Sequence, residues 1–357
     1  MIKKVRIRNF KSIKDLEFKP AKINVFIGEP NTGKSNILEA IGLFSLLYDP
    51  DRPGAFVRFR HLSNLFHDEN MEEKIKITFN NKKIEITAKG EGCYICLKQG
   101  RDKLFEANYY DPKVPGPREY DAFEFEGYLP GQREYSLYKS KEAQPQIKMV
   151  LPARPEKQMS PIKFYRYRPL MRFRETQPFS FLKPPNGENL ATLIHTHETL
   201  RNVVSNIFEQ YGYQLLLKPH QLEIEIVKKT GPILISLPYT LVADTLQRQV
   251  FFMLAIKSNK DSVLLFEEPE AHAFPRHIKT LAETIAMDKT NQFFIATHNP
   301  YLLRSIMEKA PKGSLNIYAT YMKDYQTRLK LLDRKTMEDI FVKDLDPFFN
   351  LERFLEE

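Results

Sequence analysis

The first part of the chain alternates apolar and polar positions as a β-strand does, and then changes to helical spacing. Residues 1–48 read as a strand, a turn, a second strand, a glycine-rich loop and a helix. The apolar run 23–27 (INVFI) predicts a buried parallel strand, and apolar residues at helical spacing across 36–41 predict the helix. Three short β-like runs follow at 75–79, 83–87 and 92–97, with Asn80-Asn81 as a hairpin turn between the first two.

The middle of the chain has a different character. Residues 99–160 are rich in Pro, Gly, Tyr and mixed charge, which predicts a long insertion with little regular structure. From 163 to 174 basic and aromatic residues interleave (KFYRYRPLMRFR), and as a strand this segment would place its arginines on one side.

Regular periodicity returns in the last part. The pattern predicts a helix over 189–211, then two or three strands that include 222–226 and 233–235, and a helix around 246–254. A very apolar strand at 262–266, a helix beginning near Pro275 and a strand at 292–296 come next. A helix, a strand or hairpin and a short helical tail complete the chain.

Composition narrows the class of protein without naming a function. Hydrophobic residues make up 42% and charged residues 28%, as in a folded domain. No apolar run approaches the roughly 18–20 residues that span a bilayer, and residues 1–7 lack the features of a signal peptide. We therefore expect a cytoplasmic protein with no membrane partner. The net charge of +9 weakly favours a polyanionic partner such as nucleic acid.

The two cysteines, Cys93 and Cys96, are spaced as in a redox pair or half of a zinc site. They lie in a predicted strand, where positions three apart face opposite sides. No second cysteine pair is present in the sequence. We expect buried structural thiols.

The glycine-rich loop carries the strongest chemical signal. Residues 28–35 (GEPNTGKS) fit the phosphate-loop pattern between an apolar strand and a helix. The glycines let backbone N–H groups turn toward phosphates, and the helix N-terminus adds a favourable dipole. Lys34 is expected to meet the β- and γ-phosphates of ATP, and the Ser35 hydroxyl to ligate Mg²⁺. The expected nucleotide-binding set is Gly28, Asn31, Thr32, Gly33, Lys34, Ser35 and Asn36.

Two further motifs follow apolar strands. Residues 264–270 (LLFEEPE) place two acids at the carboxyl end of a strand, where ligands of α/β sheets bind. We expect Glu267 to hold the Mg²⁺ shell and Glu268 to polarise the attacking water. His298, in the sequence 296–300 (ATHNP), is expected to sense the γ-phosphate or position that water.

Together these motifs, with residues 7–13 (IRNFKSI) and the histidine of 267–272 (EEPEAH), resemble the RecF/SMC/OLD branch of ABC-type ATPases, many of which are described as AAA-family ATPases. The resemblance covers roughly the first 70 residues and 232–305. It implies an α/β P-loop NTPase fold with a mixed central sheet flanked by helices, to which the pattern adds an antiparallel β subregion and an irregular insertion. The sequence departs from the family in that it shows no heptad run for a coiled coil, and we expect the stretch after Pro300 to be too short for a Toprim domain. It also suggests that Lys11 approaches the nucleotide, and that a glutamine loop lies near residues 62–66.

The resemblance further implies a head-to-tail homodimer that closes over two ATP molecules. Each γ-phosphate would meet the partner's signature loop, which corresponds here to Ala243, Asp244, Thr245 and Gln247. Ala243 stands where Ser is usual and Thr245 where Gly is usual. Because Ala lacks a hydroxyl and Thr hinders close backbone approach, turnover is open to question.

The chain is expected to divide into an N-terminal ATPase lobe (1–98), an insertion (99–186), a C-terminal ATPase lobe (187–310) and a hairpin with a helical tail (311–357). The leading hypothesis is an ATPase whose dimerisation acts on DNA or on a separately encoded, DNA-acting effector, in repair or defence against mobile elements. Candidate DNA contacts are Arg166, Arg168, Arg172 and Arg174, and a half-buried strand with a solvated basic face is the alternative reading. An ATP-sensing interaction module with little or no turnover is the second hypothesis. A small-molecule kinase and a transporter subunit are disfavoured.

Overall fold

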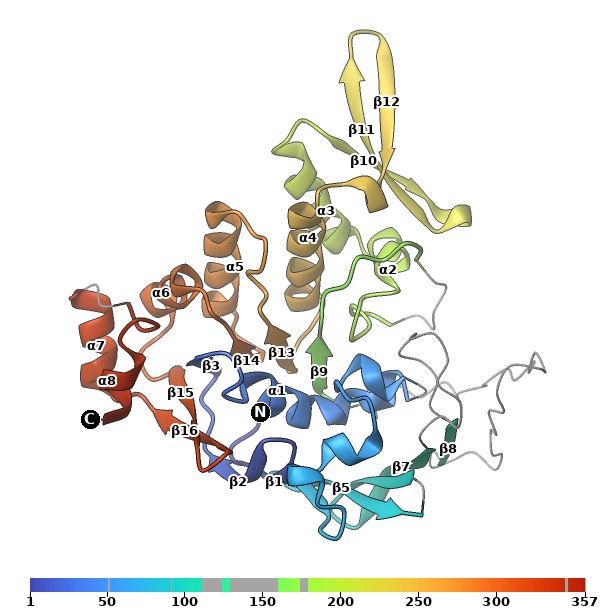
Figure 1. The fold of residues 1–357 in the computed structure, drawn as a ribbon. Helices are drawn as coiled ribbons and strands as arrows, with labels where there is room; N and C mark the ends of the chain where they lie inside the picture. The colour runs from blue at the N-terminus through green and yellow to red at the C-terminus, as the bar shows by residue number, and fades with distance from the viewer. Residues whose placement is uncertain are drawn as a thin grey trace.

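The fold is built on two sheets that enclose one helix between them (Figure 1). The computed structural model describes residues 1–50, 52–90, 92–110, 124–128, 160–173, 179–343 and 346–356. None of the helices in this described part combines the length and the apolar character that a membrane-spanning segment requires.

The central sheet has six strands in the order β16-β15-β3-β14-β13-β9. Its strands are β3 (Ile23–Gly28), β9 (Ile162–Tyr165), β13 (Val263–Glu267), β14 (Gln292–Ala296), β15 (Leu315–Lys323) and β16 (Gln326–Leu331). Neighbouring strands from β9 to β15 pair in parallel, and β16 is antiparallel to β15. All six residues of β3 are buried, as expected of an apolar strand covered on both faces. The prediction of a mixed α/β sheet is confirmed.

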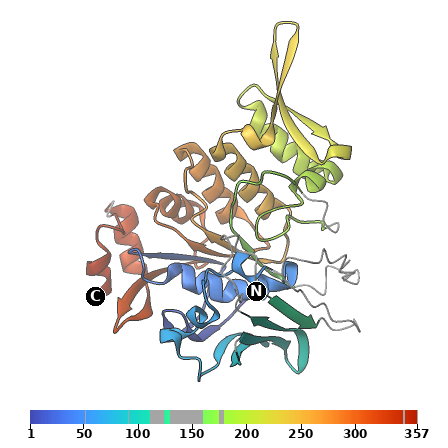
Figure 2. The same ribbon diagram turned by 45° about the vertical axis from the view of Figure 1, so that its right-hand side comes forward.

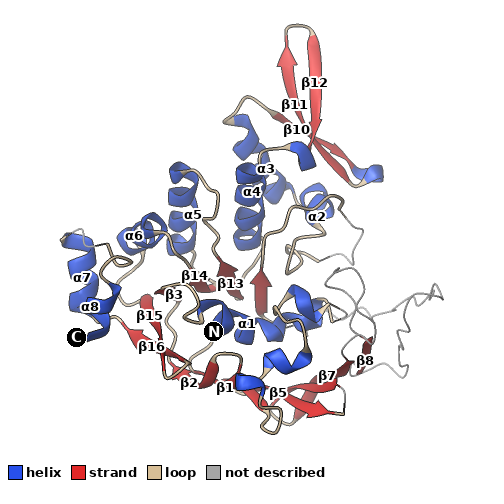
Figure 3. Ribbon diagram, in the orientation of Figure 1, coloured by secondary structure: helices blue, strands red, loops and turns tan. Residues whose placement is uncertain are grey.

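A seven-stranded antiparallel sheet lies on the other side of the molecule, in the order β2-β1-β4-β5-β6-β7-β8 (Figure 3). Its strands are β1 (Val5–Phe10), β2 (Ile13–Phe18), β4 (Ile75–Phe79), β5 (Lys82–Lys89), β6 (Gly92–Gln99), β7 (Asp102–Tyr110) and β8 (Glu124–Tyr128). The predicted turn at Asn80-Asn81 is confirmed, because Phe79 pairs with Lys82. Cys93 and Cys96 are buried thiols within β6, also as predicted.

The prediction of little regular structure from residue 99 onward is wrong for the first part of that segment. Strand β7 adds nine residues to the antiparallel sheet. Phe105, Ala107 and Tyr109 are buried at alternate positions, which is the period-2 pattern of a strand with one covered face. Glu106 and Asn108 lie between them, so the alternation was present in the sequence but was read as part of the segment rich in Pro, Gly and mixed charge. Most of 111–159 lies outside the described residues.

Helix α1 (Lys34–Gly42) and the 3₁₀ segment η1 (Leu43–Tyr48) lie between the two sheets. Helix α1 packs against strands β3, β9, β13 and β14 of the central sheet and against β1 of the antiparallel sheet. One apolar core therefore joins the two sheets through residues such as Ile37, Phe44 and Leu265. The short segments η2 (Pro53–Ala55), η3 (Leu62–Leu65) and η4 (His67–Glu69) continue from it.

The other face of the central sheet is covered by helices that share a second core with Val25, Leu264 and Ile295. These helices are α2 (Leu190–Thr196), α3 (Glu198–Glu209), α4 (Asp244–Lys257), α5 (Pro275–Met287) and α6 (Pro300–Lys309). The single helix predicted for 189–211 is two helices, because His197 adopts an extended conformation between them. Helices α7 (Arg334–Val342) and α8 (Leu351–Glu356) complete the C-terminal part, after the predicted hairpin β15–β16.

A third, three-stranded sheet extends from the helical layer (Figure 2). It consists of β10 (Gln214–Lys218), β11 (Glu223–Thr230) and β12 (Ile233–Pro238), in the order β10-β11-β12. The 3₁₀ segments η6 (Pro219–Gln221) and η7 (Tyr239–Leu241) flank these strands. Segment η7 leads into α4, so this small sheet is connected to residues 243–247, which are expected to correspond to the signature loop of the family.

Candidate functional site

The carboxyl ends of four parallel strands meet at one edge of the central sheet. Glu267 of β13 is level with Ala296 of β14, and Ala296 is level with Phe26 of β3. On the far side of β13, Tyr165 of β9 pairs with Phe266. The ends of these strands and the segments that follow them therefore lie at the same edge, which is where open α/β sheets bind ligands. They carry the phosphate loop, the acids Glu267 and Glu268, His298 and Arg166.

At two positions of the phosphate loop only glycine fits, because φ is positive and a neighbouring side chain lies where a Cβ atom would be. Gly28 has φ 152°, and a Cβ atom there would lie 2.3 Å from the Thr320 hydroxyl oxygen. Gly33 has φ 95°, and a Cβ atom would lie 2.0 Å from the hydroxyl oxygen of Thr327. Gly33 is also the residue immediately before α1. The loop is thus pressed against the β15–β16 hairpin, which fixes where the helix begins.

Lys34 folds back over its own loop. Its Nζ donates hydrogen bonds to the carbonyl oxygens of Gly28 at 2.8 Å and of Glu29 at 2.7 Å. Burial lowers the pKa of Lys34 to about 8, although Glu268 and Glu29 oppose this shift. A buried ammonium group next to backbone N–H donors is short of negative charge, which an anion would supply.

Ser35 and Glu267, the expected metal ligands, are neighbours. The Ser35 hydroxyl lies close enough to the Glu267 carboxyl to help lower its pKa. Burial tends to raise the pKa of Glu267, but Arg166, Arg58 and the nearby Ser35 outweigh it and leave the pKa lowered. A hydroxyl and an ionised carboxylate are the oxygen donors that Mg²⁺ accepts when phosphates complete its shell, so these residues fit that ion.

Glu268 and His298 face each other across the edge. The Nε2 atom of His298 lies 3.8 Å from Oε1 of Glu268, and both side chains are partly exposed. Glu268 has φ 44°, and its N–H donates to the Ala296 carbonyl at 2.9 Å. Burial and the nearby Lys34 lower the pKa of His298 against the opposing effect of Glu268. A neutral imidazole and a carboxylate can together orient a water molecule.

Glu270 ties the acidic loop to the histidine loop. Its Oε1 atom accepts a hydrogen bond from the Thr297 hydroxyl at 2.5 Å and a longer one, 3.3 Å, from the N–H of His298. Its other oxygen, Oε2, is buried without a hydrogen-bond partner. Burial raises the pKa of Glu270 to about 7, and the bonds from Thr297 and His298 only partly oppose this.

The segment compared with a signature loop begins α4. Ala243 immediately precedes the helix, and Asp244 accepts a hydrogen bond from Arg248 at 2.8 Å. The Thr245 hydroxyl donates to the carbonyl of His272 at 2.8 Å, and the buried Gln247 amide donates to Val242 at 2.8 Å. Within this chain, the Thr245 hydroxyl is therefore engaged by the loop after β13, and the Gln247 amide is engaged by the loop that precedes α4.

The remaining predicted nucleotide ligands make local contacts. The Thr32 hydroxyl donates to the Glu29 carbonyl at 2.8 Å, Asn36 donates to the Ser12 hydroxyl at 2.7 Å, and Asn31 is exposed with φ 62°. The Lys11 ammonium pairs with Glu39 on α1, and it also donates to the carbonyl oxygen of Arg58 at 2.6 Å.

The arginine-rich strand predicted for 163–174 is wrong. Strand β9 ends at Tyr165 and all four of its residues are buried, because it is a parallel strand covered on both faces. Arg166 therefore leaves the sheet at its carboxyl edge and points toward Glu267, so it does not share a solvent face with its neighbours. Arg168 and Arg172 are exposed outside any strand, and Arg174 lies outside the described residues.

The sequence reasoning missed three charged residues of this site. Glu39 on α1 is fully buried, and it contacts Arg58 through Nε at 2.8 Å and Arg166 through Nη2 at 3.1 Å. Both arginines also contact Glu267. Signals for two of them existed: Glu39 is an acid inside an apolar helical run, and Arg166 directly follows an apolar strand. Arg58 comes from the segment near η3 (Leu62–Leu65), where the glutamine loop was suspected.

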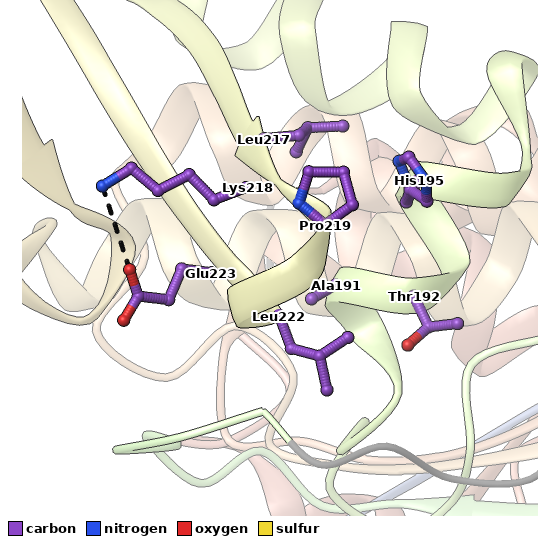
Figure 4. Close-up of a pocket in the computed structure, with 8 residues that line it drawn as sticks. All are labelled: Ala191, Thr192, His195, Leu217, Lys218, Pro219, Leu222 and Glu223. Atoms are coloured by element: carbon purple, nitrogen blue, oxygen red, sulfur yellow. Dashed lines mark ion pairs between the residues drawn. The ribbon is translucent and has the colours of Figure 1, made fainter.

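A separate pocket lies away from this edge, between α2 and the end of β10 (Figure 4). Its lining includes Ala191, Thr192 and His195 of α2 together with Leu217, Pro219 and Leu222. In the described part of the chain, no three His, Cys, Asp or Glu side chains gather to hold a metal ion.

A phosphate loop, a paired acid motif and a histidine at one sheet edge define the class of P-loop nucleotide-binding proteins. The chain belongs to the AAA ATPase domain family, whose model matches residues 1–212. A second family model, described as "AAA domain, putative AbiEii toxin, Type IV TA system", matches residues 233–304. The predicted P-loop ATPase class is confirmed, and ATP binding is supported by the family.

Similar solved structures include SMC heads. An SMC head bound to the C-winged helix domain of ScpA is 18% identical, with a TM-score of 0.49, and covers 94% of this chain and 99% of that chain. An SMC head domain from Thermotoga maritima is 14% identical, with a TM-score of 0.39, and the match covers 93% of this chain and 99% of that chain. A third structure is an SMC head with an extended coiled coil, bound to the C-terminal domain of ScpA derived from Pyrococcus furiosus. It is 13% identical, with a TM-score of 0.47, and the match covers 96% of this chain and 98% of that chain. No match was found among curated proteins.

Proposed function

We propose that this protein binds ATP with Mg²⁺ and hydrolyses it at the carboxyl edge of the central sheet. The observation that carries this proposal is the convergence of Lys34, Ser35, Glu267, Glu268 and His298, which lie at or just after the carboxyl ends of three strands of one sheet, β3, β13 and β14. These are the residue types that phosphate binding, metal ligation and water activation require.

Each side chain has a defined task in this proposal. Lys34 leaves the carbonyls of its loop and binds the β- and γ-phosphates, while the glycines and the start of α1 present N–H groups to them. Ser35 and Glu267 hold Mg²⁺, which neutralises charge on the phosphate oxygens. Glu268 orients and polarises the attacking water, and His298 positions that water against the terminal phosphate.

ATP-dependent homodimerisation is the second part of the proposal. Residues 243–247, which begin α4, would meet the γ-phosphate held by the partner, so that two molecules of ATP are enclosed. The engaged hydroxyl of Thr245 and the missing hydroxyl at Ala243 make this contact weaker than a serine would. We propose a cytoplasmic protein whose dimer acts on DNA or on a separately encoded effector, and the exposed Arg168 and Arg172 are its candidate DNA contacts.

A second function, ATP sensing with little turnover, is favoured by the same signature segment. A single-turnover assay with radiolabelled ATP separates the two functions, because a sensor retains bound ATP for many minutes whereas an ATPase converts it to ADP.

Calorimetry of ATP binding with and without Mg²⁺ tests the proposal directly. Wild type should bind ATP in the presence of Mg²⁺ and Lys34→Ala should not, while the exposed substitution Lys14→Ala should leave binding intact. Glu268→Gln should bind ATP without hydrolysing it and should dimerise, as measured by light scattering after size exclusion. Equal ATP binding by Lys34→Ala would overturn the assignment of the site.

DNA binding is tested separately through its dependence on salt. Replacing Arg168 and Arg172 with Gln should reduce the slope of log K against log salt by roughly two, about one for each phosphate contact that is lost. An unchanged slope would remove these residues from the proposal and leave the effector as the partner.

A further inference from the structure

The carboxylate expected to hold the metal is already occupied by two guanidinium groups. Arg58 donates from Nη2 to Oε1 of Glu267 at 2.9 Å. Arg166 reaches Oε2 of the same carboxylate from Nη2 at 2.9 Å and from Nε at 3.1 Å. Charge-assisted bonds of this kind are among the stronger polar contacts in a protein. A metal ion that approaches Glu267 must therefore displace at least one of them.

The arginines are held in place from behind by Glu39. The Glu39 side chain has no exposed surface, and it contacts Arg58, Arg166 and Lys11. The side chains of Arg166 and Glu267 are themselves only 12% and 13% exposed. Little water is available to screen these charges, so the electrostatic effects between them are larger than on an open surface.

The charge of this cluster argues against a metal ion arriving alone. Among the groups joined by ion pairs, three cations, Lys11, Arg58 and Arg166, face two carboxylates, Glu39 and Glu267, which leaves one excess positive charge. The exposed Glu268 acts on Arg58 from outside this cluster. A divalent cation would raise that excess to three charges in a poorly hydrated site. A triphosphate supplies the negative charge that permits the metal to enter. Arg166 also has a buried Nη1 group without a hydrogen-bond partner, which is a donor available to an added anion.

We propose that Arg166, assisted by Arg58, is a positioning residue that keeps the Glu267 carboxylate closed to divalent cations until a nucleoside triphosphate is bound. Metal entry and nucleotide entry are thereby coupled, and Glu267 is held in place in the nucleotide-free protein without a metal. When the triphosphate and its cation arrive together, Glu267 passes from the guanidinium groups to the cation. This inference rests on the proposed function and adds an order of events to it.

The experiment titrates Mn²⁺ into the purified full chain and follows free Mn²⁺ by electron paramagnetic resonance, with and without the non-hydrolysable analogue AMP-PNP. Each titration with AMP-PNP is compared with the same titration without protein, because the analogue binds Mn²⁺ by itself. Wild type should bind Mn²⁺ at this site only together with AMP-PNP. Arg166→Gln should bind Mn²⁺ without nucleotide at least about ten-fold more tightly than wild type, because one repelling charge and one competing donor are gone. Adding Glu267→Gln to Arg166→Gln should abolish the gained site.

Two variants guard against a trivial explanation. Arg58→Gln replaces a half-exposed side chain and should give a smaller gain in the same direction, so the test survives if Arg166→Gln is poorly folded. Arg101→Gln, an exposed substitution in the turn between β6 and β7, should behave as wild type. A purely structural role for Arg166 would lower the melting temperature without creating a nucleotide-free Mn²⁺ site.

The proposal is overturned if wild type binds Mn²⁺ equally well with and without AMP-PNP, or if neither arginine variant gains a nucleotide-free site. Failure of the proposed function gives a different result, because no variant would then bind AMP-PNP at all. The nucleotide-free titrations judge the role of Arg166 independently of that outcome.

Discussion

The buried carboxyl of Glu270 is joined to the hydroxyl of Thr297 by a hydrogen bond of 2.5 Å between Oε1 and Oγ1. This bond connects the loop that follows β13 to the loop that follows β14. Glu268 is two residues before one partner and His298 is next to the other. The hydrogen bond between Glu270 and Thr297 therefore positions Glu268 and His298, the two residues expected to orient water, relative to each other.

Glu270→Gln should remove a pH dependence of stability. Burial raises the pKa of Glu270 in the folded chain to about 7 from an ordinary value of 4.5. The folded state therefore holds a proton that the unfolded state has lost between these two values, and stability falls as pH rises through that window. The neutral amide should make the protein more stable than wild type at pH 8, by about 1–3 kcal/mol, and about equal at pH 4.5.

Urea denaturation at several pH values measures this difference. The exposed substitution Glu73→Gln is the matched control and should leave the pH profile unchanged. An identical profile for wild type and Glu270→Gln would show that Glu270 is ionised in the folded protein throughout.

Removing the buried acid of α1 should be costly. Glu39→Ala would leave Lys11, Arg58 and Arg166 facing one another without their shared carboxylate, and should destabilise the protein by about 3–5 kcal/mol. Glu39→Gln keeps hydrogen-bond acceptor capacity and volume, so it should cost less. Thermal and chemical denaturation of both variants checks the order, and equal stability of Glu39→Ala and wild type would contradict it.

Gly33 and Gly90 separate two effects of glycine substitution. Both have positive φ, but a Cβ atom at Gly33 would lie 2.0 Å from Thr327 Oγ1, whereas at Gly90 nothing lies within 4 Å. Gly90→Ala should cost about 1 kcal/mol from backbone strain alone. Gly33→Ala should cost about 2–4 kcal/mol, since the β15–β16 hairpin must shift as well, and should abolish ATP binding. Similar costs for both variants would mean that the hairpin yields easily.

ATP binding should be linked to proton uptake above neutral pH. Burial lowers the pKa of Lys34 to about 8 in the free protein, so at pH 8.5 much of it is uncharged. The bound phosphates favour the ammonium form, so binding should take up on the order of half a proton at pH 8.5 and much less at pH 7. Affinity should accordingly fall as pH rises through about 8.

Calorimetry in buffers of different ionisation enthalpy measures this uptake. Lys34→Arg, which stays charged at these pH values, should show weaker binding but no uptake from this position. Wild-type uptake that is the same at pH 7 and pH 8.5 would refute the link.

The sequence located the elements whose patterns are local. The apolar run 23–27 predicted strand β3, and the pattern of 28–35 predicted the phosphate loop. The acids after the apolar run 262–266 predicted the strand that carries Glu267. Each of these signals is encoded by consecutive residues. Strand β7 was missed, since its short alternation of Phe105, Ala107 and Tyr109 with polar residues was assigned to the Pro- and Gly-rich segment that follows it. Arg166 was misplaced because its surroundings come from β13 and α1, which are distant in the chain.

The sequence by itself determined that this chain contains a phosphate loop and the acidic and histidine motifs that accompany it, since hydrophobic periodicity and glycine spacing are read within a few residues. Only the tertiary structure decided that Arg58 and Arg166 both contact Glu267 and are joined behind it by Glu39. Ion pairs depend on which strand ends lie side by side. In the order β3-β14-β13-β9, the pairs β3–β14 and β13–β9 join segments more than 100 residues apart. No local pattern records that order.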